Sequence, residues 1–451
     1  MNIYGMKTKV ILLIIIHIFI ALAIYAVPIL SKVYASLLAL ISFVLVFVAK
    51  DWKTLLYWTA YITAAEVFTR MSRGLFFYEI HKYLSALLFV GIIFRTGLRW
   101  VSLPYLFYLI LLLPGVLYTW WWESLDPSYI GLHLRKDILF NIAGPITLGL
   151  GAMALLNLKM NFKAFKNLLL AMLLPVITTT VYVIVKTPSL KDIIFTTQAN
   201  FATSGGFGPN QVATILGLGM FTAFVLFILE KDFVLKMVYL FFFVLISYRS
   251  FLTFSRGGTL TGIVMIIVFL GISLISKHHF FKVKNLGAIF LTSIIIGGVF
   301  YYASEITRGM LLNRFTGRNT AGQMKEDVTS GRITIFLAEI KGFVENPVWG
   351  TGVGRAKIER KKEIGIKAAT HNEISRLISE HGIFGVLALL ILIFVPLMQG
   401  LIHKNNIFFY PFFLFWLLTI FHSSMRLAAP AVLYALSLIQ LSNEKNRLYR
   451  E

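Results

Sequence analysis

The sequence predicts an all-α protein that crosses a membrane many times. Hydrophobic residues make up 58% of its 451 positions and charged residues only 14%. The mean hydropathy of +0.80 is likewise far from that of soluble globular domains. Apolar runs long enough to cross a bilayer recur along the chain, separated by short basic segments. The chain contains no cysteine, which excludes disulfides and thiolate chemistry.

Fourteen apolar runs are candidates for membrane-spanning helices, and we expect 12 to 14 of them to cross the membrane. No small-residue cleavage site of the usual kind follows the first run, so we interpret it as a span and not as a signal peptide. The fourth and the last runs give the weakest signal. The candidates lie at residues 10–27, 34–49, 54–69, 83–95, 101–118, 138–156, 168–185, 211–229, 233–248, 258–276, 286–303, 373–399, 406–421 and 427–441.

An even number of spans places both ends of the chain on the same side of the membrane. The basic tips "GMKTK" and "NEKNRLYRE" favour the cytoplasm, because membrane proteins concentrate Lys and Arg in their cytoplasmic segments. This topology divides the chain into three parts. They are an N-terminal transmembrane bundle over residues 1–303, a large loop on the outer side over 304–372, and C-terminal helices with a cytoplasmic tail over 373–451.

The loop over 304–372 holds twelve Lys and Arg residues against seven Asp and Glu residues. The charge rule gives no reason for positive charge on the outer side, so this excess predicts an anionic ligand there. Further basic residues stand at a similar depth, where each is either an anchor at the lipid interface or a ligand for the same anion. They are Arg70, Arg73, Arg135, Lys136 and Arg249.

Several spans begin on the outer side, where the unpaired N–H groups of a helix N-terminus attract phosphate. The segment "ATSGGFGPN" holds three glycines that let the backbone approach such a ligand, and a polar residue at the helix start: Gly205, Gly206, Gly208 and Asn210. A glycine-rich turn explains the same residues. In "TFSRGG", the guanidinium of Arg256 matches phosphate oxygens, and the alternative is an anchor for the span.

Residues 330–346, "SGRITIFLAEIKGFVEN", repeat apolar side chains at helical spacing and predict an amphipathic helix of about fifteen residues. The following "ENPVWGTGVG" predicts a helix stop and a tight glycine-rich turn. Arg332 lies in the first turn of this helix, where the helix dipole disfavours a cation. Its position indicates either an anionic partner or a salt bridge to a loop carboxylate such as Asp327.

His371 stands at the end of the basic loop, just before the apolar run 373–399. Neighbouring cations lower the pKa of a histidine, and a neutral imidazole is a competent general base. The alternative is a capping or hydrogen-bonding residue. We expect His381 to be buried, and Arg376 to pair with Glu380 one turn away. The segment "HNEISRLISEH" lacks the spacing of a zinc motif, so no metal site is predicted.

Taken in order, "TFSRGG", "SGRITIF" with "NPVWGTGVG", and "THNEISRLISEHGIFG" resemble motifs of the O-antigen ligase and polymerase superfamily of bacterial envelopes. The resemblance covers most of the chain and is strongest over residues 196–386. It implies a C-type glycosyltransferase arrangement, in which His371 is the catalytic base and Arg256 and Arg332 bind pyrophosphate. The fourteen candidate spans exceed the number that is usual in that family.

The resemblance further implies a metal-independent inverting glycosyltransferase of the bacterial inner membrane, with its active site facing the periplasm. Its donor would be a glycan on undecaprenyl pyrophosphate and its acceptor lipid A-core or a glycan, with no cofactor and no nucleic-acid partner. An O-antigen or exopolysaccharide polymerase and a protein O-oligosaccharyltransferase remain alternatives, because the acceptor leaves no readable motif. A transporter or flippase for a lipid-linked glycan is the alternative outside the enzymes, although repeated halves are not visible in the sequence.

Overall fold

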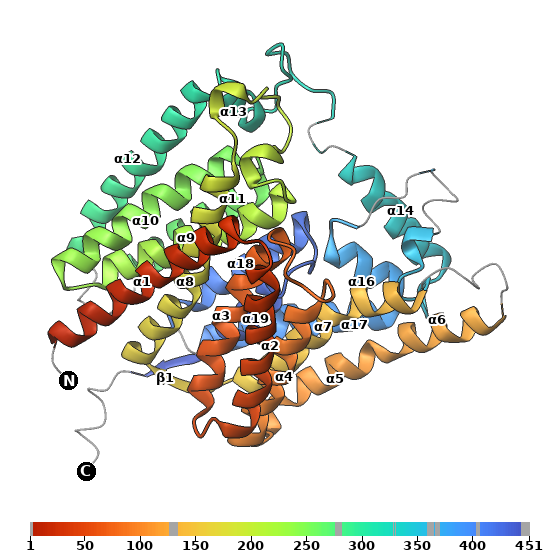
Figure 1. Cartoon of the computed structure of the whole chain (residues 1–451). Coiled ribbons are helices and arrows are strands. Elements are labelled where there is room, and N and C mark those ends of the chain that lie inside the picture. The colour runs from red at the N-terminus through yellow and green to blue at the C-terminus, as the bar shows by residue number, and fades with distance from the viewer. Residues whose placement is uncertain are drawn as a thin grey trace.

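The computed structural model describes residues 3–125, 134–275, 282–327, 329, 331–358, 365, 370–402 and 406–442. These residues form helices (Figure 1), with turns and with two three-residue strands that pair in parallel, β1 (Lys159–Asn161) and β2 (Gln440–Ser442). The N-terminal helices are α1 (Ile3–Ala26), α2 (Leu30–Val48), α3 (Trp52–Met71), α4 (Ile80–Thr96), α5 (Leu103–Leu111), α6 (Leu113–Leu125) and α7 (Leu134–Leu155). The middle helices are α8 (Phe162–Lys186), α9 (Pro209–Leu229), α10 (Phe233–Leu252), α11 (Arg256–Ile275) and α12 (Lys282–Ile306). The remaining helices are α13 (Met310–Phe315), α14 (Arg332–Glu345), α16 (Glu373–His381), α17 (Ile383–Ile402), α18 (Phe409–His422) and α19 (Ala429–Ser437).

Ten segments of the described chain are helical, long and apolar enough to cross a membrane, one of them running through α5 and α6. The prediction of an all-α polytopic membrane protein is therefore confirmed. Every one of the fourteen predicted spans falls on a helix, but α3, α4, α18 and α19 are outside the group of ten. Three of these four are short, with 17, 14 and 9 residues in α4, α18 and α19. The basic C-terminal tip lies outside the described residues.

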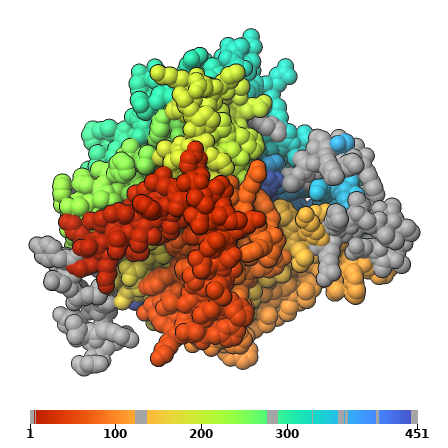
Figure 2. All heavy atoms as spheres, viewed as in Figure 1, coloured from red at the N-terminus to blue at the C-terminus, as the bar shows by residue number. Residues whose placement is uncertain are grey.

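The core of the bundle lies around α9, whose residues from Val212 to Phe227 are all buried. Helices α8, α10 and α11 pack against it, and α3 lies against α8. Helices α1 and α2 cover part of the front face in Figure 2, and they turn large apolar side chains such as Phe19 and Phe47 outward. Apolar side chains exposed on long helices are the surface that lipid covers in a membrane.

The predicted span 373–399 is wrong in one respect, because two helices, α16 and α17, replace a single continuous helix. The chain breaks at Gly382, whose φ of 58° lies in the left-handed region that glycine tolerates. The glycine-rich turn after α14 docks here, and its Thr351 and Gly352 amides donate to the Ser379 and Glu380 carbonyls over 2.8 and 3.1 Å. These bonds satisfy carbonyls that the end of α16 leaves unpaired, and they join the glycine-rich turn to the helix break.

Candidate active site

A cavity of about 420 Å³ lies where the first turns of α9, α11 and α14 meet the segment that precedes α16. Arg256, Arg332 and His371 all line it, and so does Asn210 at the start of α9. The structure therefore brings together residues that the sequence places in four separate motifs. It also adds Arg314 of α13, which the sequence analysis did not single out.

Arg256 is the first residue of α11, so its position depends on how closely that helix packs. A Cβ atom added to Gly257 would overlap the ring of His422 at the end of α18. A Cβ atom on Gly258 would overlap the backbone of Ala213 in α9. The two glycines after Arg256 thus let α11 approach both neighbouring helices, and this contact fixes the start of the helix at the cavity.

Three arginines converge on the cavity from α11, α13 and α14. Burial, with Arg256 and Arg332 nearby, lowers the pKa of Arg314 to about 10. Burial and the charge of Arg256 likewise lower the pKa of Arg332. Arg314 is held by hydrogen bonds to the carbonyls of Phe254 and Thr197, at 3.3 and 3.1 Å. Like charges that line one cavity repel one another, and a bound anion would relieve that repulsion.

His371 lies directly before α16, with its backbone carbonyl accepting from the Ser424 amide over 3.1 Å. Burial lowers the pKa of its imidazole to about 4, and the charges of Arg426 and Arg332 add to the effect. The sequence analysis expected this direction from the cations, whereas burial is the larger cause. The imidazole is therefore neutral near pH 7. Among the described residues, its buried Nδ1 atom has no hydrogen-bond partner.

Asn372, not His371, caps α16. The Asn372 side chain accepts hydrogen bonds from the amides of Ile374 and Ser375, at 2.9 and 3.4 Å. Asparagine is among the preferred N-cap residues because its oxygen satisfies amides that the first turn leaves unpaired. The alternative of a capping role for His371 is thus removed.

We expect Asn372→Ala to lower the free energy of unfolding by about 1 kcal/mol, since alanine leaves the two amides unpaired. Asn372→Ser, which keeps a capping oxygen, should restore most of this loss. Thermal unfolding of the purified variants in detergent is the measurement. Equal melting temperatures for the alanine and serine variants would show that the cap does not stabilise this helix.

A buried carboxylate attaches helix α14 to the segment that carries His371. Glu339 of α14 accepts a hydrogen bond from the Ser375 hydroxyl at 2.5 Å and another from the Thr370 hydroxyl. Arg332 lies two turns earlier on the same helix. Attachment of α14 at Glu339 therefore sets the position of Arg332 relative to His371.

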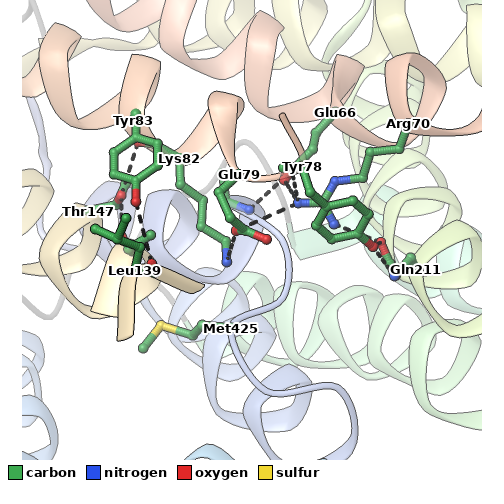
Figure 3. Close-up of polar contacts among 12 residues, drawn as sticks. Glu66, Arg70, Tyr78, Glu79, Lys82, Tyr83, Leu139, Thr147, Gln211 and Met425 are labelled. Carbon is green, nitrogen blue, oxygen red and sulfur yellow. Dashed lines mark hydrogen bonds and ion pairs between the residues drawn. The ribbon is translucent and has the colours of Figure 1, made fainter. Parts of the chain in front are cut away.

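Arg70 lies outside the group of residues that line the cavity, although the sequence offered it as a ligand. Figure 3 shows its guanidinium between the Glu66 carboxylate and the Gln211 side chain, at 2.5 and 2.9 Å. Lys82 pairs with Glu79 in the same network, at 2.5 Å. Buried charges inside a membrane protein are paired in this way because an isolated charge is costly there. Arg70 thus has a packing role within the bundle.

The other predicted basic ligands are also placed away from the cavity lining. Arg249 is buried and donates to the carbonyls of Val183 and Thr203, at 3.3 and 3.2 Å. These bonds join α10 to α8 and to the segment before α9. Arg73 and Lys136 are exposed. The side chain of Arg135 lies outside the described residues.

The predicted glycine-rich segment forms a turn that leads into α9. Gly205 and Gly206 have φ values of 67° and 73°, which favour glycine. Gly208 is the residue before the first turn of α9. None of the three lines the cavity, but the turn delivers Asn210, whose side-chain oxygen accepts from the Ser255 hydroxyl at 2.8 Å. The three glycines therefore form a turn, which is the alternative explanation that the sequence offered for this segment.

The fold and the cavity together define a multi-pass membrane protein with a cationic site beside a neutral histidine. Residues 241–390, which are 150 of the 451, match the family model described as O-Antigen ligase. The matched segment contains Arg256, Arg314, Arg332 and His371. The resemblance to the O-antigen ligase and polymerase superfamily, a glycosyltransferase-like class, is therefore confirmed over this part of the chain. No curated protein matches the chain.

Proposed function

We propose that the protein is an inverting glycosyltransferase of the O-antigen ligase type. It transfers a glycan from undecaprenyl pyrophosphate to a sugar hydroxyl at the periplasmic face of the inner membrane. The observation that carries this proposal is the single cavity that unites three arginines with the neutral imidazole of His371. A cationic wall suits a pyrophosphate, and a neutral imidazole suits proton removal from a hydroxyl.

The residues of the cavity have different roles in the displacement reaction. The acceptor oxygen attacks the anomeric carbon and forms the new C–O bond, while His371 accepts the hydroxyl proton. The bond from the anomeric carbon to the pyrophosphate oxygen breaks, and its electron pair leaves with the pyrophosphate. Arg256, Arg314 and Arg332 line the cavity and oppose the negative charge that grows on this leaving group. Guanidinium groups thereby supply charge stabilisation that a metal ion supplies in other transferases.

The acceptor is tested by deleting the gene and separating the envelope glycans on a gel. A ligase predicts loss of all long-chain lipopolysaccharide, with free polymer left on undecaprenol. A product that carries a single repeat would instead indicate a polymerase, and an unglycosylated protein would indicate a protein O-oligosaccharyltransferase. Unchanged glycans on every acceptor would overturn the proposed function. Lipid-linked glycan retained on the cytoplasmic side would point to a flippase.

A further inference from the structure

A second cavity of about 200 Å³ lies next to the first, between α7, α16 and the chain before α19. Asn141 of α7 and Glu380 of α16 line it, and the amide of Asn141 donates to the Glu380 carboxylate at 3.1 Å. Phe140 adds an aromatic ring to the lining. None of these residues has a part in the mechanism described above.

The two cavities share one wall, the short segment that carries His371. Thr370 and Glu373 line the second cavity, whereas His371 and Asn372, which lie between them in the chain, line the first. The Arg426 guanidinium donates to the Thr370 carbonyl at 2.9 Å and holds this segment in place. The segment 370–373 therefore forms the boundary between the two cavities, and the His371 side chain lines the first.

The two cavities differ in charge. The first has three arginines against one carboxylate, Glu339, which already accepts from two hydroxyl groups. The second has as many acidic as basic side chains, and Arg376 lies between two of its carboxylates, at 2.5 Å from Glu380. A balanced lining has no preference for an anion, but it offers both donors and acceptors of hydrogen bonds. That chemistry suits a neutral ligand with many hydroxyl groups.

We propose that the second cavity binds the sugar of the acceptor, on the far side of His371 from the pyrophosphate. This inference rests on the proposed function. In an inverting displacement, the attacking oxygen approaches the anomeric carbon opposite the leaving group, so the acceptor and the pyrophosphate need separate spaces on either side of it. The reacting hydroxyl of an acceptor bound there extends past the segment 370–373 to the His371 side chain, which lines the first cavity.

Two substitutions in the lining test this assignment. Asp137→Asn removes the charge of a partly exposed carboxylate that forms an ion pair with Lys357 over 4.0 Å. Ala356→Leu fills space, because this buried alanine also lines the cavity. Each should raise KM for the acceptor about tenfold, the equivalent of one lost polar contact or one steric conflict, with KM for the donor unchanged. The matched control is Asp192→Asn, an exposed carboxylate outside both cavities.

The assay uses the purified full chain, lipid-linked glycan extracted from the deletion strain as donor, and the lipopolysaccharide-core fraction of the same strain as acceptor. Arg314→Ala should show the opposite pattern, with a raised donor KM. If the parent protein transfers no glycan, the proposed function fails. If the parent is active and both cavity variants keep the parental acceptor KM, or change the donor KM instead, the acceptor assignment is overturned. Elution of each variant as a single species on size exclusion shows that it has folded.

Discussion

Replacing His371 with alanine is expected to slow glycan transfer by two or more orders of magnitude, within the range of about 10²–10⁴ typical of general-base catalysis. The affinity for the lipid-linked donor should stay near that of the parent, because the proposed mechanism assigns pyrophosphate binding to the arginines and not to His371. A single-turnover assay with purified protein, paired with a donor-binding titration, separates the two quantities. A structural histidine would instead affect stability and leave the rate of the folded fraction unchanged.

The variant His371→Asn is the critical comparison. The asparagine side chain can make some of the hydrogen bonds of a histidine, but it cannot accept a proton at neutral pH. Since Asn372 already caps α16, an asparagine at position 371 gains nothing from capping. We expect this variant to be as slow as His371→Ala. An active asparagine variant, or a defect confined to donor affinity, would remove His371 from the role of base.

The pH profile offers a third measure of the same residue. Because the pKa of His371 is lowered to about 4, its imidazole stays neutral as the pH falls from 7 to about 5.5. The ratio kcat/KM of the parent should therefore remain level over that interval and decline only at lower pH. A decline centred near 6.5, the ordinary histidine pKa, would contradict the environment described for this imidazole.

Arg256→Lys is expected to reduce the transfer rate by about 10²–10³, even though the positive charge is kept. An ammonium group is a point charge, whereas the guanidinium presents two parallel donors to phosphate oxygens. The measurement is kcat with saturating donor and acceptor. Arg318→Lys is the matched control, because Arg318 is an exposed residue of the segment after α13 and does not line the cavity.

The same assay should retain its activity in EDTA, since arginines take the part of a metal ion in the proposed reaction. Full activity of Arg256→Lys would show that charge alone suffices. Abolition of transfer by the chelator, with recovery on adding a divalent cation, would show that the arginines are not the main source of charge stabilisation.

The sequence predicted the helical fold because long apolar runs in a membrane protein leave few other structures open to the chain. It also indicated Arg256, Arg332 and His371, because each stands in a short polar break at the start of a helix. It did not indicate Arg314, whose surroundings carry no motif and whose neighbours Phe254 and Thr197 are far away in the sequence. The only signal for Arg314 in the sequence was the excess of basic residues over 304–372.

Local patterns also failed to separate ligands from packing residues among the other cations. Arg70 and Arg249 stand near helix ends, as a ligand-binding arginine would. Their hydrogen-bond partners belong to other helices, so the local sequence does not reveal them. The break at Gly382 was missed for a related reason. A glycine within an apolar run is compatible with a continuous helix, and only the docking of the turn after α14 requires the chain to bend there.

The close contact of Gly258 with the backbone of α9 has a consequence for the energetics of transfer. Two helices meet there without intervening side chains, so close packing holds together the starts of α9 and α11, which carry Asn210 and Arg256. In the proposed reaction, groups fixed in this way need little reorganisation when charge develops on the leaving pyrophosphate, whereas solvent would have to reorient at that moment. A bulkier residue at position 258 would thus raise the activation barrier through lost preorganisation, even where the arginine itself is retained.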